Sequence, residues 1–201
     1  MSSDPSNTAV VIIDMQKDFC SPDGAMAALG ADISRNTDVA ARLPQFLDSA
    51  RAAGCLIVWV TQSRQEKFLS AARRSRAKAM QRGAMTVCAA GSWGAELAEG
   101  LQPNTNDVVI EKPHYSAFVG TPLDNLLRAT ERSNLVVCGT AANVCVDSTI
   151  RDAYMSEFTV TLASDLVGWT RQELAEPAIA NLEFYFCDVE SSDDILARWN
   201  S

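Results

Sequence analysis

A cysteine stands where the sequence changes from a strand pattern to a helix pattern. The apolar run Leu135–Cys138 ends at Gly139, and a helical spacing of apolar residues begins near Cys145. A thiol at the start of a helix faces unpaired N–H groups and the positive end of the helix dipole, and both favour the nucleophilic thiolate. This context predicts a reactive cysteine. A buried structural cysteine is the alternative, because free cysteines are among the most buried residues.

The composition limits which groups could serve as the base. His114 is the single histidine of the chain, so a Cys–His pair could use only His114, and a zinc site with several imidazole ligands is excluded. The six cysteines show no Cys-x-x-Cys spacing, which argues against thiolate zinc and iron–sulfur sites. We therefore expect no metal or other cofactor, and a carboxylate or a lysine as the proton partner of Cys145.

Two further residues are predicted at the same sheet edge as Cys145. Asp14 and Lys112 end the first and third predicted strands, and ligands of open α/β sheets bind at the carboxyl ends of the strands. Asp14 would act as general base, and Lys112 would lower the pKa of both Asp14 and Cys145. Cys145 would attack a carbonyl or carbamoyl carbon, and the N–H groups of Ala141 and Cys145 would bind the oxyanion. A loop carboxylate and a solvated lysine without catalytic roles are the alternative.

The elements that must position these residues alternate along the chain. Short β-branched and apolar runs predict strands at 8–14, 55–61, 107–112, 134–139, 158–163 and 187–190. Helical spacing predicts helices at 36–53, 121–130, 142–155, 171–184 and 192–199. The alternation predicts an α/β fold. It would form a single domain over residues 1–201, a doubly wound sheet of about six mostly parallel strands with helices on both faces.

The segment 62–93 departs from this alternation. It is polar and rich in Arg and Ala, and we expect a helix within a long excursion there. Excursions of this length in compact domains are usually functional or form oligomer contacts. A basic cluster lies within it, and its simplest interpretation is a solvated helix face. The cluster consists of Arg73, Arg74, Arg76, Lys78 and Arg82.

Composition also narrows the class of protein. Hydrophobic residues make up 47% of the chain and charged residues 21%, which is typical of a globular protein. The formal net charge of −8 argues against a nucleic-acid or anionic-membrane partner. No apolar run reaches the ~20 residues of a membrane span, and no signal-peptide pattern is visible. Unpaired cysteines in apolar strands then favour the cytoplasm.

Four segments resemble the isochorismatase-like cysteine hydrolases, a family that includes nicotinamidases and ureide amidohydrolases. The segments follow the family's order: Val10–Phe19, Trp93–Leu97, Val109–Phe118 and Cys138–Asp152. The resemblance implies the isochorismatase-like fold and catalysis by Asp14, Lys112 and Cys145. It also implies a cis peptide bond between Thr140 and Ala141. A homo-oligomer, either a dimer or a tetramer, is expected on the same ground.

Two departures narrow the function within that family. Nicotinamidases carry an Asp-x-His metal motif after the second strand, whereas this chain has Thr61-Gln62-Ser63-Arg64 there. Isochorismatases proper lack a cysteine nucleophile, so Cys145 argues against vinyl-ether hydrolysis. The residues around Cys145 and the segment 181–189 look most like those of ureidoacrylate, biuret and related ureide amidohydrolases.

We therefore predict a cysteine-dependent hydrolase of non-peptide C–N bonds, acting on a small linear amide or ureide of the biuret, triuret or ureidoacrylate type. It would work through a thioester and release ammonia or carbamate. The alternatives are a hydrolase of the maleamate, N-carbamoyl amino acid or nicotinamide type, and a non-hydrolytic thiol redox protein. Nucleotide binding is disfavoured, because no glycine-rich phosphate loop follows the first strand. The expected substrate-binding residues are Phe19, Gln62, Tyr115, Phe118 and Asn143, and Trp59 is also expected near the pocket.

Overall fold

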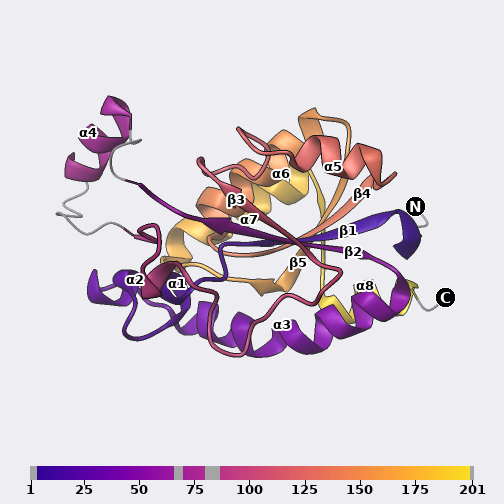
Figure 1. The fold of residues 1–201 in the computed structure, drawn as a ribbon. Helices are drawn as coiled ribbons and strands as arrows, with labels where there is room; N and C mark the ends of the chain where they lie inside the picture. The colour runs from indigo at the N-terminus through magenta and orange to yellow at the C-terminus, as the bar shows by residue number, and fades with distance from the viewer. Residues whose placement is uncertain (1–3, 66–69, 80–86, 200–201) are drawn as a thin grey trace.

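A six-stranded parallel sheet with the strand order β3-β2-β1-β4-β5-β6 forms the centre of the protein (Figure 1). The structure is a computed structural model that describes residues 4–65, 70–79 and 87–199. The prediction of a doubly wound α/β sheet is confirmed. The strands are β1 (Thr8–Ile13), β2 (Leu56–Gln62), β3 (Val108–Lys112), β4 (Asn134–Gly139), β5 (Thr159–Val167) and β6 (Asp188–Glu190).

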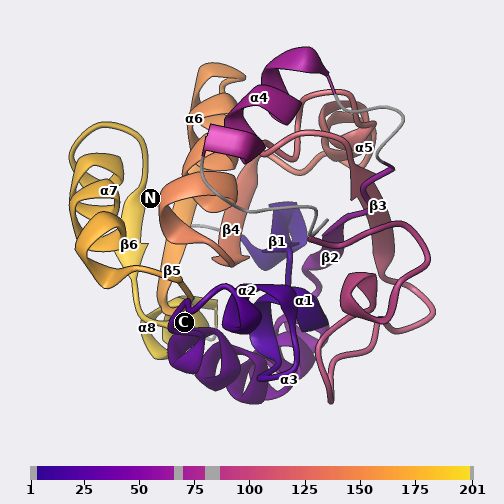
Figure 2. The same cartoon turned by 90° about the vertical axis from the view of Figure 1, so that its left-hand side faces the viewer.

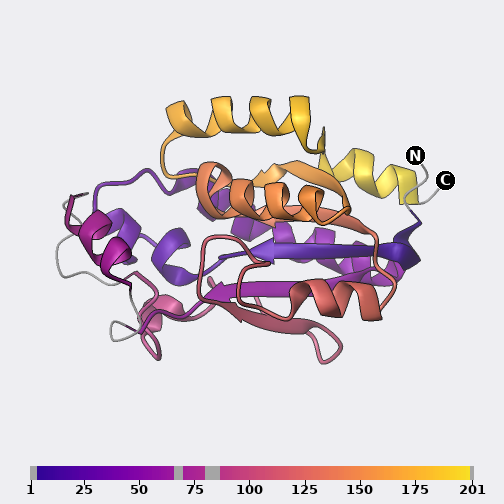
Figure 3. The same cartoon turned by 90° about the horizontal axis from the view of Figure 1, so that it is seen from above.

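Helices cover both faces of this sheet, as Figures 1 and 3 show. One face carries α5 (Leu123–Ala129), α6 (Asp147–Met155) and α7 (Gln172–Tyr185), and the other carries α3 (Ser34–Ala53) and α8 (Ser192–Trp199). The remaining described elements are short, apart from α4 (Ala71–Ala79). The short elements are α1 (Lys17–Cys20), α2 (Ala25–Ala28), the 3-10 turns Pro5–Asn7 and Trp93–Ala95, and the π-helical turn Ala142–Val146.

The central strand β1 shows why its sequence is apolar throughout. Ala9, Val11 and Ile13 pack with the helices of the α5–α7 face, whereas Val10 and Ile12 pack with α3 on the other face. Side chains alternate between faces in a strand, so a strand covered on both sides needs apolar residues at every position. This burial explains why the apolar run predicted a parallel sheet.

The long helix α3 packs by an apolar stripe. Val39, Leu43 and Leu47 recur at spacings of four and are buried against the sheet. Pro44 lies inside the helix without ending it. The helix ends at Gly54, whose φ of 95° is left-handed, as is common for a helix C-cap.

The helix expected within the excursion after β2 is α4. Figure 1 shows α4 beyond the carboxyl end of β2, apart from the main body. Arg74 and Arg76 are exposed there. Residues 80–82 of the predicted basic segment, including Arg82, lie outside the described residues. Among the helices of the described ranges, none has the length and apolar character needed to cross a membrane.

The strand order reverses between β1 and β4. From β1 the chain adds β2 and β3 on one side, and then β4, β5 and β6 on the other. At such a switch point the connections that follow the two strands diverge, which opens a crevice outside their carboxyl ends. Figure 2 looks onto this end of the sheet.

Candidate active site

The strand register brings the predicted functional residues to the switch point. Gln62, the last residue of β2, is paired with Lys112, the last residue of β3. Ile13 at the end of β1 is paired with Gly139 at the end of β4. Asp14 follows Ile13 directly, so it lies between the ends of β2 and β4.

All of these side chains lie on one face of the sheet. Residues two apart in a strand share a face, so Gln62 and Lys112 point to the same side as Val60 and Ile110, which pack beneath α5 and α6. Cys145 belongs to the same packed face, from the turn that leads into α6. The topology therefore brings a carboxyl group, a lysine amine, a side-chain amide and a thiol together at one buried position.

Asp14 and Lys112 form a wholly buried ion pair. Lys112 Nζ lies 3.0 Å from Asp14 Oδ2, and neither side chain is exposed. Lys112 Nζ also donates to the carbonyl oxygen of His114 at 3.1 Å. The Asp14 backbone has a φ of 52°, a left-handed conformation that is uncommon outside glycine and is often found at functional sites.

The two carboxylate oxygens of Asp14 have different surroundings. Oδ2 accepts from Lys112 and from Gln62 Nε2, the latter at 2.5 Å. Oδ1 is also buried, yet it has no hydrogen-bond partner within the described part of the chain. A buried acceptor without a donor is costly unless a ligand or a solvent molecule supplies one. Oδ1 is thus open to a donor that enters the site.

Cys145 lies on the other side of the Gln62 amide. Its Sγ is 3.5 Å from Gln62 Nε2, and its thiol interacts with the Asp14 carboxylate. The helix predicted for 142–155 is divided here, because Ala142–Val146 forms a π-helical turn and α6 begins at Asp147. Cys145 remains in the first turn of this helical segment, as predicted.

Burial decides the pKa values of the two reactive groups. The low-dielectric surroundings raise the pKa of the Asp14 carboxyl, although the charge of Lys112 and the interactions with Cys145 and Gln62 oppose that shift. Burial likewise raises the pKa of the Cys145 thiol, and the charge of Asp14 adds to the rise. Lys112 lowers both pKa values, as predicted, but desolvation outweighs the lysine charge, so the net shift of each pKa is upward. The resting thiol is protonated and needs a base.

The turn after β4 offers backbone N–H groups. The Thr140–Ala141 peptide bond is cis, as the family resemblance implied. Thr140 N donates to Ile13 O at 2.8 Å and Ala142 N donates to Gly168 O at 2.9 Å. The intervening N–H of Ala141 has no acceptor among the described residues, so it is available to an oxyanion, with the N–H of Cys145 in the same turn.

Four buried or half-buried polar residues support the site and were not predicted. Gln16 and Arg64 hold Gln62. Asn36 accepts from Thr140 Oγ1 at 3.1 Å, and Thr149 donates to Cys145 O at 2.7 Å. The sequence contains a signal for Asn36, which is a polar residue on the apolar stripe of α3. Gln16 and Thr149 lie close to Asp14 and Cys145 in sequence, but only the packed structure shows their contacts.

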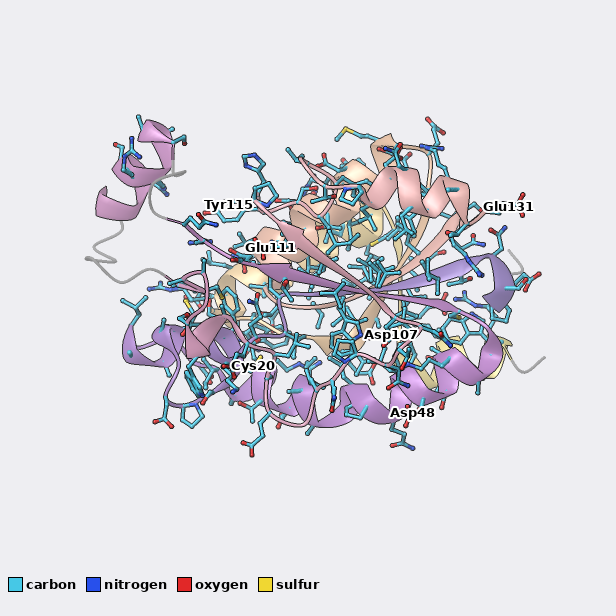
Figure 4. All side chains as sticks on the ribbon, in the orientation of Figure 1. Cys20, Asp48, Asp107, Glu111, Tyr115 and Glu131 are labelled. Carbon is cyan, nitrogen blue, oxygen red and sulfur yellow. The ribbon has the colours of Figure 1, made fainter. Side chains whose placement is uncertain are left out.

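The other residues predicted near the substrate are dispersed. Asn143 lies in the π-helical turn beside Cys145. Phe19 in α1 packs between α2 and the α3 face. Tyr115 is 42% exposed in the loop after β3, beyond Glu111 at the outside of the molecule (Figure 4). Phe118 packs against the core and Phe158, with ring centroids 5.7 Å apart.

Trp59 does not approach the site. It is buried on the α3 face, and its Nε1 donates to Asp107 Oδ2 at 2.9 Å. Asp107 precedes β3 and therefore lies toward the amino ends of the strands. The expectation for Trp59 is wrong because its place in β2, one residue before Val60, turns it to the opposite face of the sheet from Gln62.

Comparison with known proteins gives one family. The isochorismatase domain model matches residues 8–194. A cysteine hydrolase from Pseudomonas syringae pv. phaseolicola 1448A is 27% identical, with a TM-score of 0.86 over 100% of this chain and 95% of that one. The pyrazinamidase of Pyrococcus horikoshii, solved in complex with zinc, is 25% identical, with a TM-score of 0.77 over 92% and 99%. N-carbamoylsarcosine amidase from Thermoplasma acidophilum shares the fold, at 22% identity and a TM-score of 0.74 over 93% and 97%.

The residues present do not fit a zinc site like that of a metal-binding relative. Within residues 4–65, 70–79 and 87–199, no three His, Cys, Asp or Glu side chains cluster as metal ligands would. The only histidine, His114, contacts Lys112 through its backbone carbonyl.

Proposed function

Because the chain belongs to the isochorismatase domain family of cysteine hydrolases, we propose that it is a cysteine-dependent amidohydrolase. The observation that carries this proposal is the wholly buried Asp14–Lys112 pair beside the Cys145 thiol. Burying an ion pair costs several kcal/mol per ion in desolvation, so such a pair is poor evidence for a purely stabilising role. A perturbed carboxyl and thiol together at the switch point of an α/β sheet are typical of an active site.

The first half of the reaction forms a thioester. Asp14 takes the proton of the Cys145 thiol, and the sulfur bonds to the amide or carbamoyl carbon while the C=O electron pair moves to oxygen. The N–H groups of Ala141 and Cys145 bind this oxyanion. Asp14 then returns its proton to the nitrogen, the C–N bond breaks, and ammonia leaves.

The second half releases the acid. A water molecule gives a proton to Asp14 and its oxygen bonds to the thioester carbon. The C–S bond breaks, and the sulfur takes the proton back from Asp14, which restores the resting thiol. The ammonium group of Lys112, paired with Asp14, offsets the negative charge that passes between carboxylate, oxyanion and sulfur.

The substrate class proposed is a small linear ureide or amide with a terminal carbamoyl or amide group. Asp14 Oδ1, a buried acceptor with no partner in the described residues, favours a ligand with an N–H donor. The Pyrococcus horikoshii pyrazinamidase is an amidase by name. The sequence around Cys145 adds the narrower preference for biuret, triuret or ureidoacrylate.

The thiol redox alternative has no such support. It would need a resolving cysteine, and Cys138 was the nearest candidate in sequence. Cys138 Sγ contacts the carbonyl of Val11 and lies on the α3 face, whereas Cys145 lies on the α5–α7 face. The sheet therefore separates the two sulfur atoms.

Cys145→Ala tests the nucleophile. Hydrolysis should disappear while the fold remains, because the sulfur is proposed to do chemistry. The readout is ammonia release from biuret, triuret, ureidoacrylate, maleamate, nicotinamide and isochorismate. Cys187→Ser, which changes a thiol in the residue before β6, is the matched control and should keep full activity. A pure Cys145→Ala protein that retains more than a few per cent of turnover refutes the assignment.

Asp14→Asn and Lys112→Ala should each lose at least ~10²-fold in kcat/KM, the usual scale for a positioned acid–base group. Each leaves a buried partner unpaired, so the double variant Asp14→Asn/Lys112→Met, which buries no charge, separates lost chemistry from lost stability.

On the panel, a preference for nicotinamide or isochorismate above ~10-fold in kcat/KM refutes the ureide assignment.

A further inference from the structure

Gln62 touches both groups that exchange the proton. Its Nε2 is 2.5 Å from Asp14 Oδ2 and 3.5 Å from Cys145 Sγ. The side-chain amide is buried, and it donates to both acceptors from one nitrogen. To bind substrate through this amide, Gln62 would need its nitrogen free. The N–H donors of Gln62 are instead already directed at the Asp14 carboxylate and the Cys145 sulfur.

Arg64 fixes the orientation of this amide. Its Nε and Nη2 donate to Gln62 Oε1 at 3.0 and 2.6 Å. The amide could otherwise rotate by half a turn, which would point its oxygen at Asp14 and repel the carboxylate. With both guanidinium nitrogens on the oxygen, the NH2 group must face Asp14 and Cys145. A cation on the oxygen also polarises the amide and strengthens its N–H donors.

The backbone around both residues is held as well. Gln16 binds the main chain of Gln62 on both sides, accepting from its N–H at 2.8 Å and donating to its carbonyl at 2.7 Å. Arg64 N donates to Cys88 O, and Ala90 N donates to Arg64 O. The pair is therefore locked at both its side chains and its main chain.

We propose, on the basis of the amidohydrolase function above, that Gln62 is a catalytic residue and that Arg64 is the residue that positions it. Lys112 is the one cation in contact with Asp14 among the described residues, yet the site must stabilise a carboxylate at rest and a thiolate during attack. The Gln62 amide gives each anion a neutral donor. As the proton moves from sulfur to Asp14, the donor on the carboxylate loses importance and the donor on the sulfur gains it.

The test measures the thiol directly and does not depend on the substrate. Cys145 is alkylated with iodoacetamide across a pH series, and its labelled peptide is quantified by mass spectrometry. Removing the donor should destabilise every ionised form of the Asp14–Cys145 pair. Gln62→Ala is therefore expected to move the alkylation midpoint upward by about one pH unit, and Gln62→Glu by more, because it adds a carboxylate.

Kinetics on the best substrate of the panel give the second readout. Gln62→Ala should lower kcat about tenfold or more and change KM less than about threefold, since the lost contacts are to the reacting groups. Arg64→Ala should change both readouts in the same direction by less, and Arg64→Lys should restore part of the loss. Ser63→Ala, on the same strand exit, is the control and should match the wild type.

Unshifted alkylation midpoints in both Gln62→Ala and Arg64→Ala overturn the inference. If Gln62→Ala does not fold, the alkylation midpoints and kcat values of Arg64→Ala and Arg64→Lys provide the test, because both variants leave Gln62 itself in place. If the wild type hydrolyses nothing on the panel while the midpoints shift, the amidohydrolase proposal fails, but the role of Gln62 toward the thiol holds.

Discussion

The raised pKa of Asp14 is the feature of a single residue with the clearest consequence for activity. A general base must be ionised to accept a proton, and burial holds the pKa of this carboxyl above its usual range. A higher pKa makes the carboxylate a stronger base toward a thiol that is itself hard to ionise. The two shifts act in the same direction, because burial disfavours the charged form of both the Asp14 carboxyl and the Cys145 thiol.

Activity should therefore be lost on the acid side at a higher pH than for an ordinary aspartate, whose pKa is ~3.9. As the pH falls through the raised pKa, Asp14 becomes protonated and cannot act as base. The measurement is kcat/KM from about pH 4 to about pH 9, with far-UV circular dichroism at each pH to exclude unfolding. An acid limb centred at or below pH ~4 with the fold intact would contradict this prediction.

At the same scale, the sequence predicted which residues meet but not how they act. Asp14, Lys112 and Cys145 could be predicted to share one edge, because each follows or ends a strand and parallel strands end together. The direction of the pKa shifts could not, since it depends on how completely distant segments exclude water. Gln62 was expected to bind substrate, and its bond to Asp14 became visible only with the β2–β3 register.

Among the elements, the ends of β1 and β4 approach each other very closely near the site. A Cβ at Gly139 would lie 2.1 Å from Ile13 O, and the residue has a φ of 105°. Only glycine lets β4 pass so close to β1 before turning toward Cys145. The turn that carries Ala141 depends on this approach.

Gly139→Ala should destabilise the protein by about 3 kcal/mol or more, because the backbones of both strands must separate. Gly54→Ala is the matched control. Gly54 also has a left-handed φ of 95°, but nothing lies within 4 Å of its Cβ position, so only the conformational cost of about 1 kcal/mol applies. Urea unfolding of both variants gives the comparison. Equal losses would show that crowding at the strand ends is unimportant.

The boundaries of the elements show where sequence patterns lose their information. The apolar strands matched the structure to within a residue or two, except that β5 runs on to Val167. Its predicted end at Ala163 was too early because Ser164 and Asp165 are polar. They bind Glu190 and Ser192, which fold back beside the strand. The turns α1 and α2 were not predicted, since four residues are too few for a helical period.

For the whole molecule, the burial of thiols couples stability to pH. Burial raises the pKa of Cys20 and Cys55 to about 12, and it raises the pKa of Cys88, Cys138 and Cys145 as well. In the unfolded chain each thiol ionises near pH ~8.5, whereas the folded protein keeps its protons. The unfolded state then binds fewer protons, so the free energy of unfolding falls as the pH rises.

The thiol contribution to the free energy of unfolding should thus be constant to about pH 8 and should decrease above pH ~8.5, by up to about 1.4 kcal/mol per pH unit for each buried thiol, and the urea midpoint should fall with it. The measurement compares unfolding at about pH 7.5 and about pH 9.5 under reducing conditions. Cys55→Ser removes one titrating thiol, so the unfolding free energy should fall less between these two pH values by the contribution of that one thiol. A midpoint that does not change over this range would contradict the prediction.

An exposed apolar surface leads to a prediction about assembly. Tyr154 and Met155 at the end of α6 and Phe184 and Tyr185 at the end of α7 are all at least half exposed, and Tyr154 and Tyr185 both contact the ring of Phe186. Contiguous exposed aromatic surface of this kind usually marks an interface. We expect a homo-oligomer, a dimer or a tetramer, in which a second copy of the chain covers this surface.

Light scattering should give a mass that is a multiple of 21.7 kDa at micromolar concentration. Phe184→Ser combined with Tyr185→Ser should lower that mass, because it removes the most exposed rings. Val109→Thr, an exposed apolar position on β3 away from this surface, serves as the control. A single 21.7 kDa species for the wild type would rule out the assembly.

The four polar side chains at the switch point come from the ends of β1, β2 and β3 and from the turn after β4. No incomplete version of the sheet can hold them together, so the proposed chemistry is an all-or-none property of the assembled centre. During refolding, enzymatic activity would report only the molecules in which these four strands have already paired in their native order. Circular dichroism would also count those that have formed helices alone. The difference between the two signals measures how late the central strands join.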